Sequence, residues 1–160
     1  MRAVAYVLGM QATLSRLVAT DSTNTALLVQ RTVLGLVMVP HGAQKVFGAF
    51  GGYGFRGTLD YFTGVLHIPA PLAILVIVGE LAGAVMLIAG LGTRFAAAMI
   101  AAIMIGAVMT THLQVGFFMN WFGSQQGEGF EYHLLALALA VPLAIWGGGR
   151  YALDGVLRRE

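Results

Sequence analysis

A run of twenty residues that is apolar except for one carboxylate at its centre constrains this chain more than any other feature. The run extends from Pro71 to Gly90, and its only ionisable residue is Glu80. A helix of roughly 20 apolar residues is long enough to cross a bilayer. On insertion scales, a carboxylate at the middle of such a helix costs about 2.5–3.5 kcal/mol. We therefore expect Glu80 to face a polar interior and to mark a functional site.

Composition points to an integral membrane protein. Hydrophobic residues make up 58% of the 160 residues and charged residues only 10%, whereas soluble domains carry about 25% charged residues. The net charge of +2 and the lack of a basic run exclude a nucleic-acid partner. The chain has no cysteine, so disulfides and thiolate chemistry within it are excluded. A redox role would need a bound cofactor or a partner protein.

The apolar pattern predicts an all-α fold, a bundle of four transmembrane helices. A three-residue link between the second and third helices makes them antiparallel neighbours. In the long link between the first two helices, Leu59, Phe62 and Leu66 predict a short interfacial helix that ends before Pro69. The four predicted spans are residues 25–47, 71–91, 93–113 and 132–147.

Charge and polarity divide the chain into three parts. Residues 1–24 are expected to form a cytoplasmic or interfacial extension, residues 25–149 the transmembrane domain, and residues 150–160 a cytoplasmic tail. Within the extension, an amphipathic helix is favoured over a cleaved signal peptide. Most basic residues fall on the side of both termini, and the opposite half has only Lys45 and Arg56. The positive-inside rule then places both termini in the cytoplasm, and we expect a bacterial inner-membrane protein.

The link 114–129, on the outer side, is rich in aromatic residues, which indicates a belt at the membrane surface. Small residues recur every fourth position in the third and fourth helices, and Gly79 and Gly83 form a G-x-x-x-G in the second. Such stripes let helices approach closely in lipid, and we expect tight packing, above all for the third helix. The two stripes are Ala98, Ala102, Gly106 and Thr110, and Ala136, Ala140, Ala144 and Gly148.

Basic residues follow one face of the first helix. Arg31, His41 and Lys45 lie on a common heptad stripe. Glu80 would be neutralised by Lys45 or Arg31, so these three residues are predicted to form a buried charge network. The simpler alternatives are an ion pair that only permits insertion, or a Lys45 side chain that reaches to the membrane surface.

Further polar residues should lie at the outer level of the bundle. The end of the first helix, the end of the third and the start of the fourth are on the same side. The candidate pocket residues are His41, Gln44, Lys45, Glu80, His112, Glu131 and His133. Such a group could bind the carbonyls of a quinone and pass protons, or relay protons without a ligand. A metal or haem iron on His41, His112 and His133 is less well supported, because typical ligand spacings are missing.

The chain resembles the DoxX family of small four-helix membrane proteins over residues 27–154. The resemblance rests on Arg31 with Gly35 and on five motifs. These are residues 40–48 (PHGAQKVFG), 79–83 (GELAG), 92–94 (GTR), 111–121 (THLQVGFFMNW) and 127–134 (GEGFEYHL). The family is associated with quinol oxidase and thiosulfate:quinone oxidoreductase systems, and relatives act with partner subunits. The resemblance implies an outward-facing site and a link to the quinone pool.

The sequence therefore predicts an integral membrane subunit of a respiratory redox complex, which is either non-catalytic or catalytic together with its partners as part of a quinone-linked oxidoreductase. Lipid, other membrane redox subunits and a quinone are the expected partners. The alternative is a structural or assembly subunit whose polar cluster only fixes helix register. A stand-alone transporter is a third class, although four helices leave little room for alternating access.

Overall fold

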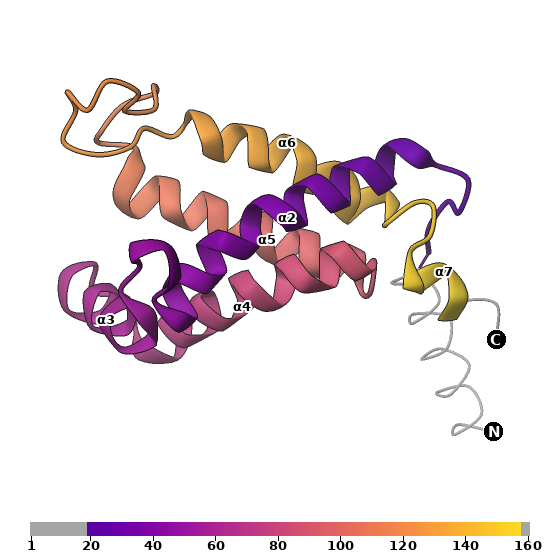
Figure 1. Cartoon of the computed structure of the whole chain (residues 1–160), viewed down its shortest axis with the longest axis horizontal. Helices are drawn as coiled ribbons and strands as arrows, with labels where there is room; N and C mark the ends of the chain where they lie inside the picture. Colours follow the sequence, from indigo (N-terminus) through magenta and orange to yellow (C-terminus); the bar gives the residue numbers. More distant parts are fainter. Residues whose placement is uncertain (1–18, 158–160) are drawn as a thin grey trace, which may run out of the picture.

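The structure is a computed structural model that describes residues 19–157, and within this range it contains helices and no strands. Four long helical segments lie side by side, and the short helix α7, Leu153–Leu157, packs at one end (Figure 1). Three of the described helical segments are long and apolar enough to cross a membrane. The all-α prediction is confirmed. Most of the predicted extension, residues 1–18, lies outside the described residues.

The first long helix, α2, spans Thr25–Phe47, the range predicted from the sequence. It begins where the side chain of Asn24 accepts a hydrogen bond from the Leu27 N–H at 3.1 Å, which satisfies a free backbone donor. It ends at Gly48, whose φ of 72° is a left-handed conformation that glycine adopts without a steric penalty. Local capping therefore sets both ends of α2.

The second and third long helices form an antiparallel pair. Helix α4 spans Ala70–Ala89, and after a tight turn α5 spans Thr93–Ala107 and continues as a π-helical turn, η3, over Val108–His112. The pair packs through small residues, because a Cβ atom on Gly83 would already lie 3.0 Å from Met99. The close approach predicted for Gly79 and Gly83 is present.

Helix α6, Glu131–Trp146, is apolar but has only 16 residues. It packs against α2 and α5, while α2 also packs against α4. Between α2 and α4 the chain forms η1, Ala49–Gly51, then α3, Gly54–Asp60, and a π-helical turn η2, Tyr61–Val65. The short helix expected in this link is therefore present, as α3 and η2.

The hydrophobic core lies along the line where α2, α4, α5 and α6 meet. The small-residue stripe of α6 contributes to it, since Ala136 and Ala140 are buried. The stripe of α5 does not, because Ala98 and Ala102 are exposed and nothing lies within 4 Å of a Cβ placed on Gly106. The prediction that this stripe packs tightly is wrong for contacts within the chain.

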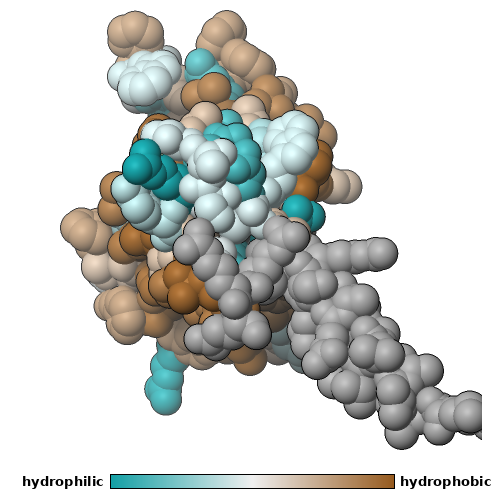
Figure 2. Space-filling model, turned by 90° about the vertical axis from the view of Figure 1, so that its right-hand side faces the viewer, coloured by the Kyte–Doolittle hydropathy of each residue, from teal (hydrophilic) through white to brown (hydrophobic). Residues whose placement is uncertain are grey.

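Buried polar groups join the helices at the end that carries α7. Asp154 accepts hydrogen bonds from the backbone N–H groups of Gly92 and Thr93, at 2.6 and 2.9 Å. These contacts cap α5 with a carboxylate, which the positive end of a helix favours. Seen from this end, hydrophilic residues gather in the middle of the face and hydrophobic residues border them (Figure 2). This end therefore presents a hydrophilic patch within an apolar border.

Candidate functional site

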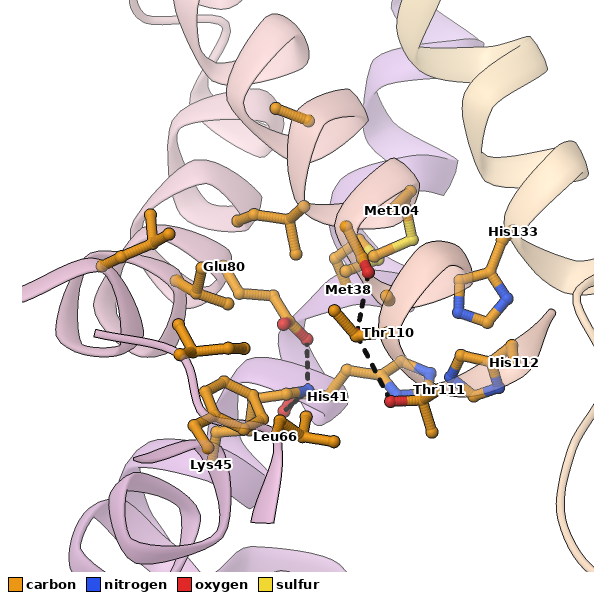
Figure 3. A pocket seen from close by; sticks show the side chains of 18 of the residues that line it. Met38, His41, Lys45, Leu66, Glu80, Met104, Thr110, Thr111, His112 and His133 are labelled. Atoms are coloured by element: carbon orange, nitrogen blue, oxygen red, sulfur yellow. Dashed lines mark hydrogen bonds and ion pairs between the residues drawn. The ribbon is translucent and has the colours of Figure 1, made fainter. Parts of the chain in front are cut away.

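A cavity of about 570 Å³ opens at the other end of the bundle, among α2, α4, α5 and α6 and beside η2. Most of its wall is apolar, with residues such as Leu66, Leu75 and Ile103. Polar side chains gather in two places. Figure 3 shows Lys45 and Glu80 on one side of the pocket and the imidazoles of two histidines on the other. Pockets with apolar walls and a few convergent polar groups are the usual form of small-molecule sites.

The first polar group is an ion pair between α2 and α4. Lys45 Nζ lies 2.8 Å from Glu80 Oε1 and also donates to the backbone oxygen of His41 at 3.4 Å. The Glu80 side chain is 2% exposed, whereas that of Lys45 is 26% exposed. Glu80 is thus held in the interior by one cation, and the ammonium group borders the cavity.

The second polar group is a pair of imidazoles, His112 and His133, whose ring centroids are 4.1 Å apart. His112 ends the π-helical turn η3, and its Nδ1 lies 2.8 Å from the backbone oxygen of Glu128. His133, near the start of α6, is 6% exposed, and its Nδ1 has no hydrogen-bond partner among the described residues. A buried nitrogen without a partner is unusual, because buried polar groups are normally hydrogen-bonded.

Two aromatic residues connect these groups. The rings of His41 and Tyr132 are 5.5 Å apart, and Tyr132 is at the same distance from His133. The Tyr132 hydroxyl donates to the sulfur of Met38 at 3.3 Å. His41 lies between the two polar ends (Figure 3).

Comparison with known proteins places the chain in a family. The pattern of the DoxX family matches residues 26–113, more than half of the chain. The chain belongs to the DoxX family. A Bacillus subtilis (strain 168) protein named "Putative oxidoreductase CatD" is 30% identical over 127 residues, which cover 79% of this chain and 83% of that protein. No solved structure matches the chain. Membership of the DoxX family and the apolar helices together indicate a membrane protein.

The structure brings five of the seven candidate pocket residues of this DoxX-family chain together around the cavity: His41, Lys45, Glu80, His112 and His133. The other two do not line it. Gln44 donates to the backbone oxygen of Phe50 at 3.3 Å, and Glu131 accepts from the Met119 N–H at 3.3 Å. Both have local partners, because each lies beside a turn with free backbone groups.

The position of Arg31 differs from that expected in the predicted charge network. Its guanidinium donates to backbone oxygens of Leu87, Ile88, Gly148 and Arg150, at the end of the bundle that carries α7. Arg31 and Lys45 share a helix face but are 14 residues apart, roughly 21 Å along the axis. The expected network therefore consists of the pair of Lys45 and Glu80 alone, with Arg31 bonded to carbonyls elsewhere.

The three imidazoles do not form a metal centre of the usual kind. Among residues 19–157, no three His, Asp or Glu side chains are arranged to hold a metal ion. His112 and His133 touch, but His41 faces Tyr132. The prediction that these three histidines could share a metal is therefore wrong for this geometry.

Sequence reasoning missed several residues of the site. Tyr132, Glu128 and Thr110 all line the cavity. Tyr132 and Glu128 lie inside the family motif 127–134, which was the available signal. Glu131 was predicted because it opens a helix, but it is Glu128 that lines the cavity and supplies the backbone carbonyl for His112.

Proposed function

We propose that this chain is an integral membrane subunit of a redox complex and binds a membrane quinone in the cavity beside Lys45, Glu80, His112 and His133. The observation that carries the proposal is a cavity of about 570 Å³ with apolar walls and polar groups at two opposite sides. A quinone ring has oxygens at two opposite sides and an apolar body. The relative's printed name, an oxidoreductase, supports a redox role.

The cavity is bordered by exposed residues that would face lipid, which supports a ligand that enters from the membrane. Leu72 and Leu75 of α4 line the cavity and are 50% and 60% exposed. Ala102 on α5 also lines it and is exposed. In a membrane these surfaces would face acyl chains. A ligand with an apolar tail could therefore enter sideways between α4 and α5, with its tail left in the bilayer.

We propose four membrane crossings in a bacterial inner membrane, with α6 as the fourth and both termini in the cytoplasm. Helix α6 would be roughly 24 Å long, somewhat short for a hydrocarbon core of about 30 Å. Its packing against α2 and α5 supports an alignment along these longer helices. Residues 114–130 would then face outside, where Trp121 and Phe122, 78% and 95% exposed, suit the membrane surface. The division into 1–24, 25–149 and 150–160 follows.

The competing function is a structural subunit that holds a larger assembly together. The exposed small residues Ala98 and Ala102 favour it, because such a stripe can receive a helix of another protein. The two residues are one helical turn apart, and only Ala102 lines the cavity. This difference separates the two functions experimentally.

The test is gentle purification from native membranes, with mass spectrometry of partner proteins and extraction of bound quinone, for the native chain, Ala102→Leu and Ala98→Leu. The proposal expects redox partners and quinone with the native chain and with Ala98→Leu, and loss of quinone alone with Ala102→Leu. Loss of partners with both variants, and no quinone on the native chain, would instead support a structural subunit.

A further inference from the structure

We propose that a second hollow, of about 250 Å³, binds the headgroup of a zwitterionic phospholipid that carries a primary ammonium. The hollow lies at the end of the bundle that carries α7, between residues 19–24, the start of α5 and the end of α6 (Figure 1). None of its lining residues lines the larger cavity. The proposal needs only that the chain is a membrane protein, so it does not depend on the proposed function.

The first feature of this hollow is the guanidinium group of Arg94. Arg94 is the second residue of α5 and is partly buried, and its Nε donates to the backbone oxygen of Ala19 at 3.0 Å. Its two terminal nitrogens have no hydrogen-bond or ion-pair partner among residues 19–157. The bond at Nε restrains the guanidinium and leaves the terminal N–H groups for a ligand. Such paired donors suit the oxygens of a phosphate.

The second feature is the carboxylate of Asp21. Its Oδ1 accepts from the hydroxyl of Thr23 at 2.6 Å and from the Thr23 N–H at 3.0 Å. These two hydrogen bonds hold the pKa of Asp21 below its usual range, so the carboxylate is ionised at neutral pH. Within the part of the chain that the structure describes, Oδ2 has no hydrogen-bond partner. This oxygen can therefore accept from a ligand.

The two charges border one hollow but do not neutralise each other. Arg94 and Asp21 both line it, yet they form no ion pair with one another. Opposite charges in this arrangement suit a ligand that carries both signs. The phosphate of a zwitterionic phospholipid would meet the guanidinium of Arg94, and its ammonium would meet the carboxylate of Asp21.

Apolar side chains in the same hollow indicate that the ligand is a lipid. Leu27, in the first turn of α2, and Trp146, the last residue of α6, line it beside the two charges. The Trp146 side chain is 58% exposed, and tryptophan is typical of the boundary between headgroups and acyl chains. The glycerol and the first acyl carbons of a lipid can pack on the indole, whereas a free phosphate compound has no apolar part to bury there.

The carboxylate of Asp21 selects among phospholipids. An anionic phospholipid such as phosphatidylglycerol has no cation for Asp21, and its phosphate would be repelled by the carboxylate. The quaternary ammonium of phosphatidylcholine carries no proton that it could donate to Oδ2. A primary ammonium has three such protons, so phosphatidylethanolamine matches both charges of the hollow.

The test measures lipid contact through the fluorescence of Trp146. Trp121→Phe leaves Trp146 as the only tryptophan of the chain. The full chain with this change is titrated in detergent with phosphatidylethanolamine, phosphatidylcholine or phosphatidylglycerol, each with brominated acyl chains that quench an indole on contact. We expect phosphatidylethanolamine to bind roughly fivefold more tightly than the other two, which corresponds to about 1 kcal/mol and is the upper contribution of one exposed ion pair.

Two substitutions in the same background separate the two contacts. Asp21→Asn keeps an acceptor for Thr23 but removes the charge, so we expect phosphatidylethanolamine and phosphatidylcholine to bind equally. Arg94→Gln removes the phosphate contact common to all three lipids, so each should bind several-fold more weakly. Arg150→Gln is the matched control, because Arg150 is exposed at the same end but does not line the hollow. Thermal unfolding checks that all variants are folded.

The ranking of the three lipids needs no change within the hollow, so it tests the proposal even if a variant fails to fold. Equal quenching by the three lipids overturns it, and so does a preference that survives Asp21→Asn. Equal losses with Arg94→Gln and Arg150→Gln also overturn it, because surface charge alone would then attract the lipid. Soluble glycerophosphoethanolamine in excess should not restore the fluorescence. If it does, the hollow takes a free phosphate compound and the lipid proposal is wrong.

Discussion

Lys45 on α2 and Glu80 on α4 form an ion pair with 2.8 Å between Nζ and Oε1, at the edge of the cavity. It is the only ion pair between side chains in the described part of the chain. Glu80, 2% exposed, depends on Lys45 for neutralisation. The pair therefore links the packing of two helices to the polarity of the site.

Removal of one partner should destabilise the protein more than removal of both. Lys45→Met leaves the Glu80 carboxylate buried and unpaired. Removing one partner of a fully buried ion pair costs about 3–5 kcal/mol of stability. Because Lys45 is 26% exposed, we expect the loss of stability to lie at or below the lower end of this range. Unfolding in a fixed detergent mixture measures it.

The double variant Lys45→Met with Glu80→Met is the matched control. It buries no charge, so it should be more stable than Lys45→Met alone. If the double variant is as unstable as the single variant or more so, Glu80 is not in a low-dielectric environment and the ion pair has no structural role.

The positions of the helices could be predicted from the sequence because their signals are local. Asn24 and Gly48 cap α2 through contacts with neighbouring residues, and the range 25–47 follows from them. The partner of Arg31 could not be predicted in this way. A heptad pattern tells which face Arg31 occupies, but the carbonyls that it meets belong to residues 56 to 119 positions away.

The candidate site was predictable in part for the same reason. His41, His112 and His133 lie near helix ends on one side of the bundle, so counting residues along each helix brings them to one level. The π-helical turn that presents His112 has no clear sequence signal. The choice between Glu128 and Glu131 depends on the path of the link 114–130, which is fixed by tertiary contacts such as the bond from Phe130 N to Gly116 O.

The hydrogen bonds of Arg31 predict that the stability of the fold depends strongly on its guanidinium group. Arg31 is 2% exposed and donates to backbone oxygens of α4 and of the segment after α6. Lys has a single ammonium and cannot reproduce a fork of donors. We expect Arg31→Lys to lower the free energy of unfolding by at least about 2 kcal/mol, since hydrogen bonds to charged groups contribute about 1.5–3 kcal/mol each.

Arg150→Lys is the control for the Arg31 variant. The Arg150 side chain is exposed and lies over the Tyr151 ring, with 4.7 Å from Cζ to the ring centroid. Such exposed cation–π contacts contribute about 0.5–1 kcal/mol, so the change should be small. Equal losses of stability in the two variants would contradict the role given to the buried guanidinium.

Substitutions of two glycines should separate the effect of helix packing on stability from the effect of the cavity wall. A Cβ on Gly42 would lie 2.7 Å from the Leu81 Cα, whereas a Cβ on Gly106 would have nothing within 4 Å. Gly42→Ala should therefore separate α2 from α4 and cost about 1–3 kcal/mol. Gly106→Ala should be neutral or stabilising by up to about 1 kcal/mol, because alanine favours the helix. Thermal unfolding of both variants in one detergent compares them directly.

Helix α6 is the shortest of the proposed spans, so its crossing needs a direct test, and the cysteine-free sequence makes one available. Ser22, Ser124 and Val156 are exposed and lie before α2, in the outer link and after α6. Each is replaced by cysteine and exposed in intact cells to a maleimide that cannot cross membranes. With four crossings and cytoplasmic termini, Ser124→Cys is labelled rapidly, and Ser22→Cys and Val156→Cys only after the cells are opened. Labelling of Val156→Cys in intact cells, with Ser22→Cys still protected, would mean that α6 does not cross, and would leave the outer end of the cavity without the wall that carries His133.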